Sequence, residues 1–251
     1  MRLPCTCRVP FMALTVLPGQ DMLANTALGI NHLIESLPRA DRVRIQTHAS
    51  IVSLTSDCVL CEPHQRYRQV YFPLTCIISL ETSLSGHPPL SLGLIGNGGM
   101  LGATLALGSD VASMRAVVRG AGCALSLSAA QMRRELRASP RLTRMLLHHL
   151  AALMAHLPQS AACAHFHKIE PRLARWLLMM QDSAASSSFY LTHESLASML
   201  GVHRSGVTIA AGDLQRRKLI NYSRGMIQIL DRPGLEASAC ECYLPWKASS
   251  V

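Results

Sequence analysis

The chain has 251 residues, long enough for two modest domains that each bury a core of their own. It carries 24 Lys and Arg against 15 Asp and Glu, and this formal charge of +9 favours anionic partners such as nucleic acid. The sequence contains no apolar run near the roughly 20 residues of a membrane span, so we expect a cytoplasmic globular protein with no membrane partner.

Residues 1–25 are expected to form a disordered leader. The apolar stretch between Pro10 and Pro18 is short for a secretory signal, and no small-residue cleavage site follows it. A translation start at Met22 is the alternative interpretation. Nine cysteines, an odd number, in a chain without a clear secretory signal predict reduced thiols rather than a disulfide framework.

Residues 26–137 have the pattern of a sensor-like β-domain. Short strands are predicted at Arg66–Phe72, Cys76–Leu84 and Leu90–Ile95, and turn residues separate them. From about Asn31 to Ser128 the sequence alternates in this way between short strands and turns. The pattern predicts an antiparallel roll or barrel rather than a parallel α/β sheet.

Residues 138–167 are predicted to be a dimerisation helix and hinge, which follow a short helix over Ala129–Arg137. Ser139 and Pro140 provide a cap and a first-turn proline. Apolar residues then recur at steps of four and three, which is the seam of a helix that packs on a partner helix. The expected dimer interface is Leu147, Leu150, Met154 and Leu157.

Packing of this stripe on its own domain is an equally weighted alternative, because two heptads are too few to establish a coiled coil. Pro158 removes a backbone hydrogen bond, so we expect the helix to kink or end between Met154 and Pro158.

Residues 168–237 are predicted to be a winged helix-turn-helix domain, and residues 238–251 a C-terminal tail. After a helix over Lys168–Gln181, Thr192 is a plausible N-cap and Gly201 a plausible left-handed turn residue. A second helix begins near His203. Its period places four side chains on the face toward the core, those of Val207, Ala210, Ala211 and Leu214.

Two short strands continue this segment and form the predicted wing. They cover Lys218–Tyr222 and Ile227–Leu230, and a tight basic turn over Ser223–Met226 joins them. The helical period leaves Arg204, Ser205 and Thr208 free to contact base edges in the major groove. The expected contacts to the DNA backbone are Thr192, His203, Arg216, Arg217, Lys218, Ser223 and Arg224.

Several motifs, in this order, resemble the CRP/FNR superfamily of bacterial transcription regulators. They are Val70-Tyr71-Phe72-Pro73, Gly93-Leu94-Ile95-Gly96, Gly99-Met100-Leu101-Gly102, Ala161-Ala162-Cys163, Glu170-Pro171-Arg172-Leu173-Ala174-Arg175-Trp176-Leu177 and Leu191-Thr192-His193-Glu194, with Cys240-Glu241-Cys242-Tyr243 recurring in one branch. The resemblance implies an α+β fold: an N-terminal antiparallel β-roll of the jelly-roll, cyclic-nucleotide-binding-like type, a long dimerisation helix and a C-terminal winged helix-turn-helix.

The resemblance also implies a homodimeric regulator of transcription on double-stranded DNA, with a roughly palindromic operator and with RNA polymerase as a further candidate partner. No enzymatic activity is expected, because Cys58 and Cys61, the only candidate redox pair, lie in a strand-rich region and do not open a helix. A ligand-binding or adaptor protein that kept the fold without binding DNA is an alternative.

The effector pocket departs from the members of the family that bind cyclic AMP. The resemblance places it at Gly99, Met100, Leu101, Gly102, Ser113 and Arg115. Methionine replaces the glutamate that accepts hydrogen bonds from the ribose, and Ser113-Met114 stands where an arginine binds the phosphate. A buried phosphate without an arginine is costly to desolvate, so cyclic nucleotide is not the expected effector.

No metal or other cofactor is predicted. The cysteine spacing does not match the family's N-terminal iron–sulfur run, although a thiol- or metal-based redox-sensing regulator stays open as an alternative. Cys76 and Cys123 are expected to be small buried hydrophobes. His149 and His156, seven residues apart, are interpreted as solvated residues on a helix flank rather than as ligands.

Overall fold

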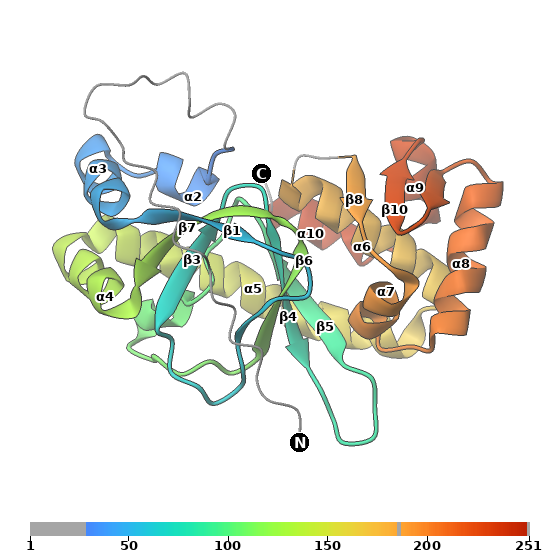
Figure 1. The fold of residues 1–251 in the computed structure, drawn as a ribbon, viewed down its shortest axis with the longest axis horizontal. Helices are drawn as coiled ribbons and strands as arrows, with labels where there is room; N and C mark the ends of the chain where they lie inside the picture. The colour runs from blue at the N-terminus through green and yellow to red at the C-terminus, as the bar shows by residue number, and fades with distance from the viewer. Residues whose placement is uncertain (1–28, 185–186, 250–251) are drawn as a thin grey trace.

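The structure, a computed structural model, describes residues 29–184 and 187–249. It contains a β-roll, a long helix and a C-terminal helical domain with a small sheet, so the predicted α+β class is confirmed. Figure 1 shows the roll in the middle of the molecule, with α3 and α4 at one end and α6 to α9 at the other. The predicted leader and the alternative start at Met22 lie outside the described residues.

Two antiparallel sheets form the roll. Their strand orders are β1-β7-β3 and β2-β6-β4-β5. The strand bounds are β1 Ser50–Leu54, β2 Val59–Cys61, β3 Gln69–Pro73, β4 Ile77–Thr82, β5 Leu90–Ile95, β6 Arg115–Gly120 and β7 Gly122–Ser128. Apolar side chains from both sheets, including Ile78, Val118 and Ala124, fill the space between them. The three strands predicted in this region are present, and Leu90–Ile95 has the expected bounds.

Two helices precede the roll, and the expectation of strands from Asn31 onward is wrong for this segment. They are α2 His32–Glu35 and α3 Arg39–His48. Asn31 starts α2 by accepting a hydrogen bond from Ile34 N at 3.1 Å, and its amide donates to carbonyls of the roll. Helix α3 buries only Ile45, so the sequence has no apolar stripe that would indicate a helix here.

The roll leads into α4 (Ala129–Ala138), and α5 (Pro140–Phe166) follows directly. Ser139 caps α5 by accepting from Leu142 N at 3.1 Å, as its position before Pro140 predicts. The expectation that α5 could end near Pro158 is wrong, because the helix continues for two more turns. Pro158 and Met154 are exposed, so water can solvate the carbonyl whose helical hydrogen bond the proline removes.

One face of α5 packs on the roll, and the interpretation of His149 and His156 as solvated flank residues is wrong. His156 is buried, and His149 lies against the glycine-rich segment of the roll. A Cβ atom on Gly99 would lie 2.6 Å from His149 Cε1, so only glycine allows this approach. Met100 N–H donates to His149 Nε2 at 3.4 Å, and burial lowers the pKa of His149 to about 4.

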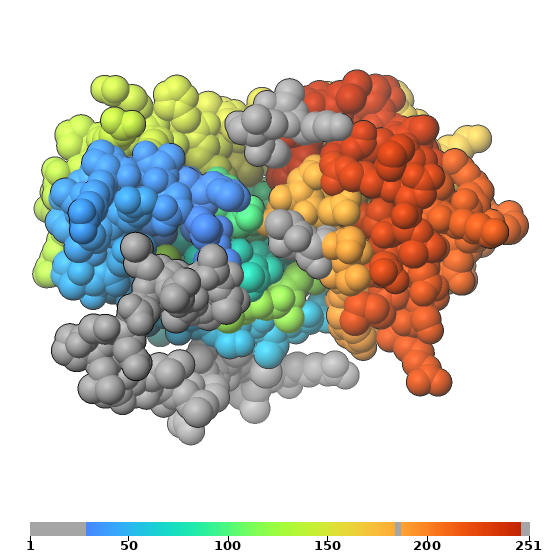
Figure 2. All heavy atoms as spheres, turned by 90° about the horizontal axis from the view of Figure 1, so that it is seen from above, coloured from blue at the N-terminus to red at the C-terminus, as the bar shows by residue number. Residues whose placement is uncertain are grey.

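The C-terminal domain surrounds α6. Its elements are α6 Ile169–Ala184, β8 Ser188–Tyr190, α7 His193–Leu200, α8 Arg204–Arg216, β9 Ile220–Ser223, β10 Met226–Ile229, α9 Arg232–Ser238 and α10 Tyr243–Ser249. The small sheet has the order β8-β10-β9, so the predicted two-stranded wing gains a third strand from the segment before α7. Figure 2 shows this domain, in orange and red, at the end of the molecule opposite the N-terminal helices. Among the described residues, no helix is both long and apolar enough to cross a membrane.

The contact between His149 and Met100 predicts a pH-dependent stability. The pKa of His149 in the folded chain, about 4, lies below its ordinary value of 6.5, so the unfolded chain binds the proton more readily. The contribution is complete above pH 6.5 and is lost as the pH falls toward 4. We expect the free energy of urea unfolding, followed by circular dichroism, to fall between pH 7 and pH 5, with His149 accounting for on the order of 2 kcal/mol.

The variant His149→Gln keeps an acceptor for Met100 N–H but does not titrate, so this pH-dependent loss should shrink in it. His148→Gln, at the exposed neighbouring position, is the matched control and should behave as the wild type. Equal pH dependence in wild type and His149→Gln would contradict the assignment.

Candidate nucleic-acid interface

Helices α7 and α8 are joined by a tight turn, and three residues mark where α7 begins, where it ends and where α8 begins. Thr192 Oγ1 accepts from Ser195 N at 3.1 Å and caps α7. Gly201 ends α7 in the left-handed region, with φ of 63°, as the sequence predicts. His203 is the N-cap of α8. Leu196 and Ala197 of α7 pack in the core of the domain, together with the inward residues of α8, which are Val207, Ala210, Ala211 and Leu214.

The opposite face of α8 is open to solvent. Arg204, Ser205 and Thr208, the predicted base contacts, are all exposed there, together with Ile209 at 68%. Figure 1 shows α8 at the outer edge of the domain, away from the roll. The helix therefore presents a mixed polar and apolar surface that could enter a major groove.

His193 and Tyr222 connect α8 with the wing, and the sequence did not identify this role. Their rings stack with centroids 4.5 Å apart, and His193 Nδ1 is 3.0 Å from Thr208 Oγ1. Burial, followed by the charge of Arg204, lowers the pKa of His193, which favours the neutral ring. Thr208 is thus oriented from α7, and a shallow hollow of about 410 Å³ lies between α8 and the wing at this point.

The cations predicted to contact the DNA backbone fall into two groups. Arg216 forms an ion pair with Asp213 at 2.6 Å, and Arg217 with Glu170 at 2.8 Å. Lys218 and Arg224 are exposed and have no ion pair among the described residues, and the same holds for Arg204. Ser223 is exposed on the wing, whereas the hydroxyl of Thr192 is engaged in its cap.

The last turn of α7 faces the roll. Leu200 forms a bridge with Leu90, and Arg119 of the roll donates to Ser198 Oγ at 3.1 Å. A hollow of about 660 Å³ lies between the two domains. The roll contributes Arg115 to its lining, and the C-terminal domain contributes Thr192, His203 and Arg204.

The predicted effector residues do not come together as one pocket. Met100 and Leu101 are 1% and 2% exposed and belong to the apolar core, while Gly99 and Gly102 allow close packing on His149 and Val70. Ser113 is exposed. Arg115 lies at the hollow between the domains and pairs with Glu62 at 3.3 Å.

The residues predicted for a dimer interface divide between the two sides of α5. Leu147 and Met154 are exposed, at 39% and 66%, whereas Leu150 and Leu157 are partly buried. Leu150 packs against the core of the roll. One edge of the stripe therefore packs on its own domain, as the alternative interpretation expects, and the other edge faces solvent. The dimer interface stays a prediction.

The comparisons with known proteins agree with this geometry. The profile of the Crp-like helix-turn-helix domain matches residues 171–238. A search by sequence among curated proteins gives no significant match.

Solved structures with the same fold include FixK2 from Bradyrhizobium japonicum, with a TM-score of 0.64 and 15% identity over 76% of this chain and 98% of that chain. They also include TTHA1359, a CRP/FNR regulator from Thermus thermophilus, with a TM-score of 0.58 and 23% identity over 76% and 98%. CLP from Xanthomonas campestris, described as a c-di-GMP-responsive global regulator, has a TM-score of 0.60 and 15% identity over 76% and 99%.

Residues 171–238 are therefore a Crp-like helix-turn-helix domain. The described residues as a whole share the fold of solved regulators of the CRP/FNR type. The resemblance of the sequence motifs to this superfamily is thereby confirmed.

Proposed function

We propose that the chain acts as a homodimer that recognises a roughly palindromic operator through α8. The observation that carries this proposal is the division of α8 into two faces. Its inner face is buried in the core of the domain, while Arg204, Ser205 and Thr208 are exposed at its N-terminal end. Arg204 would bind guanine bidentately or a phosphate, and Thr208 would contact a thymine methyl or a base edge.

Lys218 and Arg224 would hold phosphates on either side of the groove. Both have backbone φ in the left-handed region, 59° and 50°, at the tight corners before β9 and between β9 and β10. Neither residue has an ion pair among the described residues, so binding a phosphate would break no ion pair within the protein. At Arg216 and Arg217 it would compete with the ion pairs to Asp213 and Glu170. Release of counterions from the phosphates would supply most of the salt-sensitive affinity.

The dimer would form along the exposed edge of α5. Leu147 and Met154 are seven residues apart and therefore lie on one side of the helix, with the exposed Ala151 between them. A second copy packed on this edge would bury apolar surface that is now in water. Two-fold symmetry would then place two copies of α8 about 34 Å apart, one turn of DNA.

The roll would influence DNA binding through its contact with α7 rather than by holding cyclic nucleotide. Met100 occupies the core where cyclic-AMP-binding relatives have a ribose acceptor, and a buried thioether cannot replace a carboxylate there. Arg119 contacts α7 and also pairs with the buried Glu81 at 2.6 Å. A signal that moved β5 or β6 would thus move the last turn of α7. We propose no resident cofactor within the roll itself.

The Arg204→Ala variant tests base recognition directly. We expect it to bind an operator selected by the wild-type chain from random sequences about ten-fold more weakly or worse, since one lost base contact costs roughly 1–3 kcal/mol. Lys218→Ala should instead lower the log–log salt slope of binding by about one. Fluorescence anisotropy with labelled duplex measures both quantities.

Arg66→Ala is the matched control, because Arg66 is a highly exposed arginine on the roll, 80% exposed. It should retain the affinity and salt slope of the wild type. Two outcomes would contradict base recognition by α8: the wild-type chain enriches no sequence from the random pool, or Arg66→Ala weakens binding as much as Arg204→Ala does.

The Met154→Glu variant tests the dimer. A charge in the middle of the apolar edge would have to be desolvated in the interface, so we expect a monomer by sedimentation at concentrations where the wild type is a dimer. Leu84→Glu makes the same kind of change at an exposed apolar residue of the roll, 73% exposed, and should stay dimeric. A dimeric Met154→Glu chain would place the interface elsewhere.

A further inference from the structure

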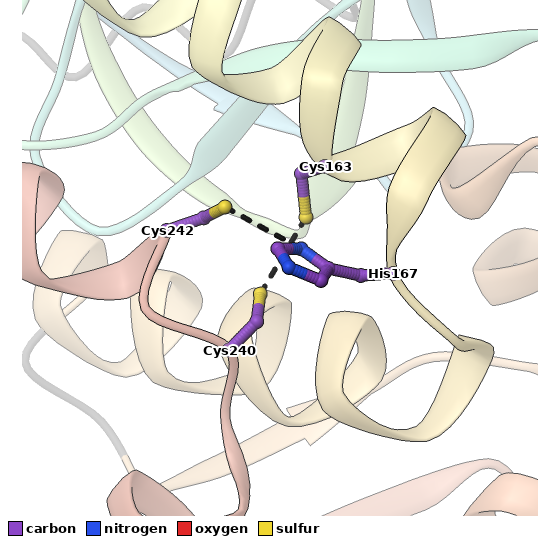
Figure 3. A group of neighbouring side chains, drawn as sticks. All are labelled: Cys163, His167, Cys240 and Cys242. Atoms are coloured by element: carbon purple, nitrogen blue, oxygen red, sulfur yellow. Dashed lines mark hydrogen bonds between the residues drawn. The ribbon is translucent and has the colours of Figure 1, made fainter.

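Four potential metal ligands from two distant parts of the chain meet where α5 ends. Cys163 lies in the last turn of α5, and His167 is the residue that caps it. Cys240 and Cys242 lie between α9 and α10. Figure 3 shows the three thiols and the imidazole converging on one point, and their ligand atoms all lie within 4.8 Å of one another.

Local structure explains why each pair faces the same way. Cys163 and His167 are four residues apart, so they lie on one side of the helix end, where His167 N–H donates to Cys163 O at 3.1 Å. Cys240 and Cys242 belong to a turn closed by the hydrogen bond from Tyr243 N to Cys240 O, also 3.1 Å. The burial of α10 residues Tyr243 and Trp246 in the domain core holds this turn against α5 and α6.

The separations of the ligand atoms suit a single tetrahedral ion. Cys163 Sγ and Cys240 Sγ are 3.5 Å apart, and so are Cys242 Sγ and His167 Nδ1. Tetrahedral zinc with its usual bond lengths sets sulfur atoms about 3.8 Å apart and a sulfur and a nitrogen about 3.6 Å apart. A disulfide would need about 2.0 Å. A cluster of several iron atoms needs its ligands farther apart than 4.8 Å allows.

The surroundings also match a metal site. His167 presents Nδ1 to the thiols, and its other nitrogen, Nε2, pairs with Glu241 at 3.2 Å. Such a carboxylate fixes the ring orientation of a metal-binding histidine. Gln159 donates from Nε2 to Cys242 Sγ at 2.8 Å, a second-sphere contact to a ligand sulfur.

The charges nearby give an independent argument. Arg172 and Arg175 are 6% and 1% exposed, and neither has a carboxylate partner among the described residues. Arg175 donates to Ser160 Oγ at 3.1 Å and Arg172 to the Leu200 carbonyl. Both interact electrostatically with Cys163. A zinc ion with three thiolates and one imidazole carries a net charge of −1, which would offset buried cations that otherwise lack a counter-charge.

We propose that Cys163, His167, Cys240 and Cys242 bind one Zn²⁺ in a closed Cys₃His site. The coordination is complete with protein ligands, so the role is structural rather than catalytic. Binding releases the remaining thiol protons to solvent and involves no electron transfer. The ion would fasten the end of α5 and the start of α6 to the C-terminal segment, and so fix how the DNA-binding domain leaves the long helix. This role goes beyond DNA recognition and does not depend on it.

Metal analysis of the purified full-length chain tests the site. We expect one zinc per chain, measured by inductively coupled plasma mass spectrometry, in the wild type and in Cys123→Ser, which alters a partly buried cysteine of the roll. Cys240→Ser and Cys242→Ser should lose most of the metal. Zinc that stays at the wild-type level in both variants would overturn the proposal, and so would iron in place of zinc.

A second measurement does not require a variant that folds. The wild-type chain is treated with chelator under reducing conditions and then titrated with Co²⁺, which should give thiolate-to-cobalt charge-transfer bands and tetrahedral ligand-field bands that saturate at one equivalent. Added Zn²⁺ should displace the cobalt and raise the unfolding temperature of the metal-free chain, followed by the fluorescence of Trp176 and Trp246 in the C-terminal core. Absence of these bands, or a Cys163–Cys240 disulfide in freshly reduced and repurified protein, would contradict the site.

Discussion

The two-sided packing of α5 is the constraint on which the rest of the molecule depends. One side contributes Leu142 and Leu146 to the core of the roll and sets His149 against Gly99. The other side exposes Leu147 and Met154 to solvent. A single helix of 27 residues thus anchors the roll and at the same time keeps an apolar edge exposed, along which we propose that a second copy of the chain packs.

The position of the DNA-binding domain follows from the end of this helix. Helix α6 begins three residues after α5 ends, and it is buried along the run from Leu173 to Met180 by α7, α8 and α9. Helix α8 is therefore positioned relative to α6, and α6 relative to α5. The cluster of Cys163, His167, Cys240 and Cys242 and the contact of Arg119 with α7 lie at two separate points of this arrangement, of which only the second involves the roll.

The sequence predicted the elements whose signals are local. Thr192 and Gly201 mark the ends of α7 through capping chemistry and a left-handed φ, and the inward residues of α8 follow from the helical period. Strands β3, β4 and β5 of the roll could be predicted for the same reason, as short apolar runs between turn residues. The exposed positions of Arg204, Ser205 and Thr208 could likewise be derived from the period alone.

The features that the sequence did not reveal depend on contacts between distant segments. Helix α3 has only one buried apolar residue and no apolar stripe. His149 is partly covered because α5 meets the roll at Gly99. The stacking of His193 on Tyr222 joins residues 29 positions apart. Cys163 and His167 form one pair of candidate ligands, and Cys240 and Cys242 form the other. Cys163 and Cys240 are 77 positions apart, so the spacing along the chain does not indicate a set of four ligands.

We propose that two copies of the chain, joined along α5, read two half-sites with α8. Hydroxyl-radical footprinting of the full-length protein on a selected operator tests it most directly. We expect two protected tracts with related sequences of opposite orientation, whose centres lie about 10 base pairs apart, one turn of the duplex. A single asymmetric tract at saturating protein, or protection that does not depend on sequence, would contradict it.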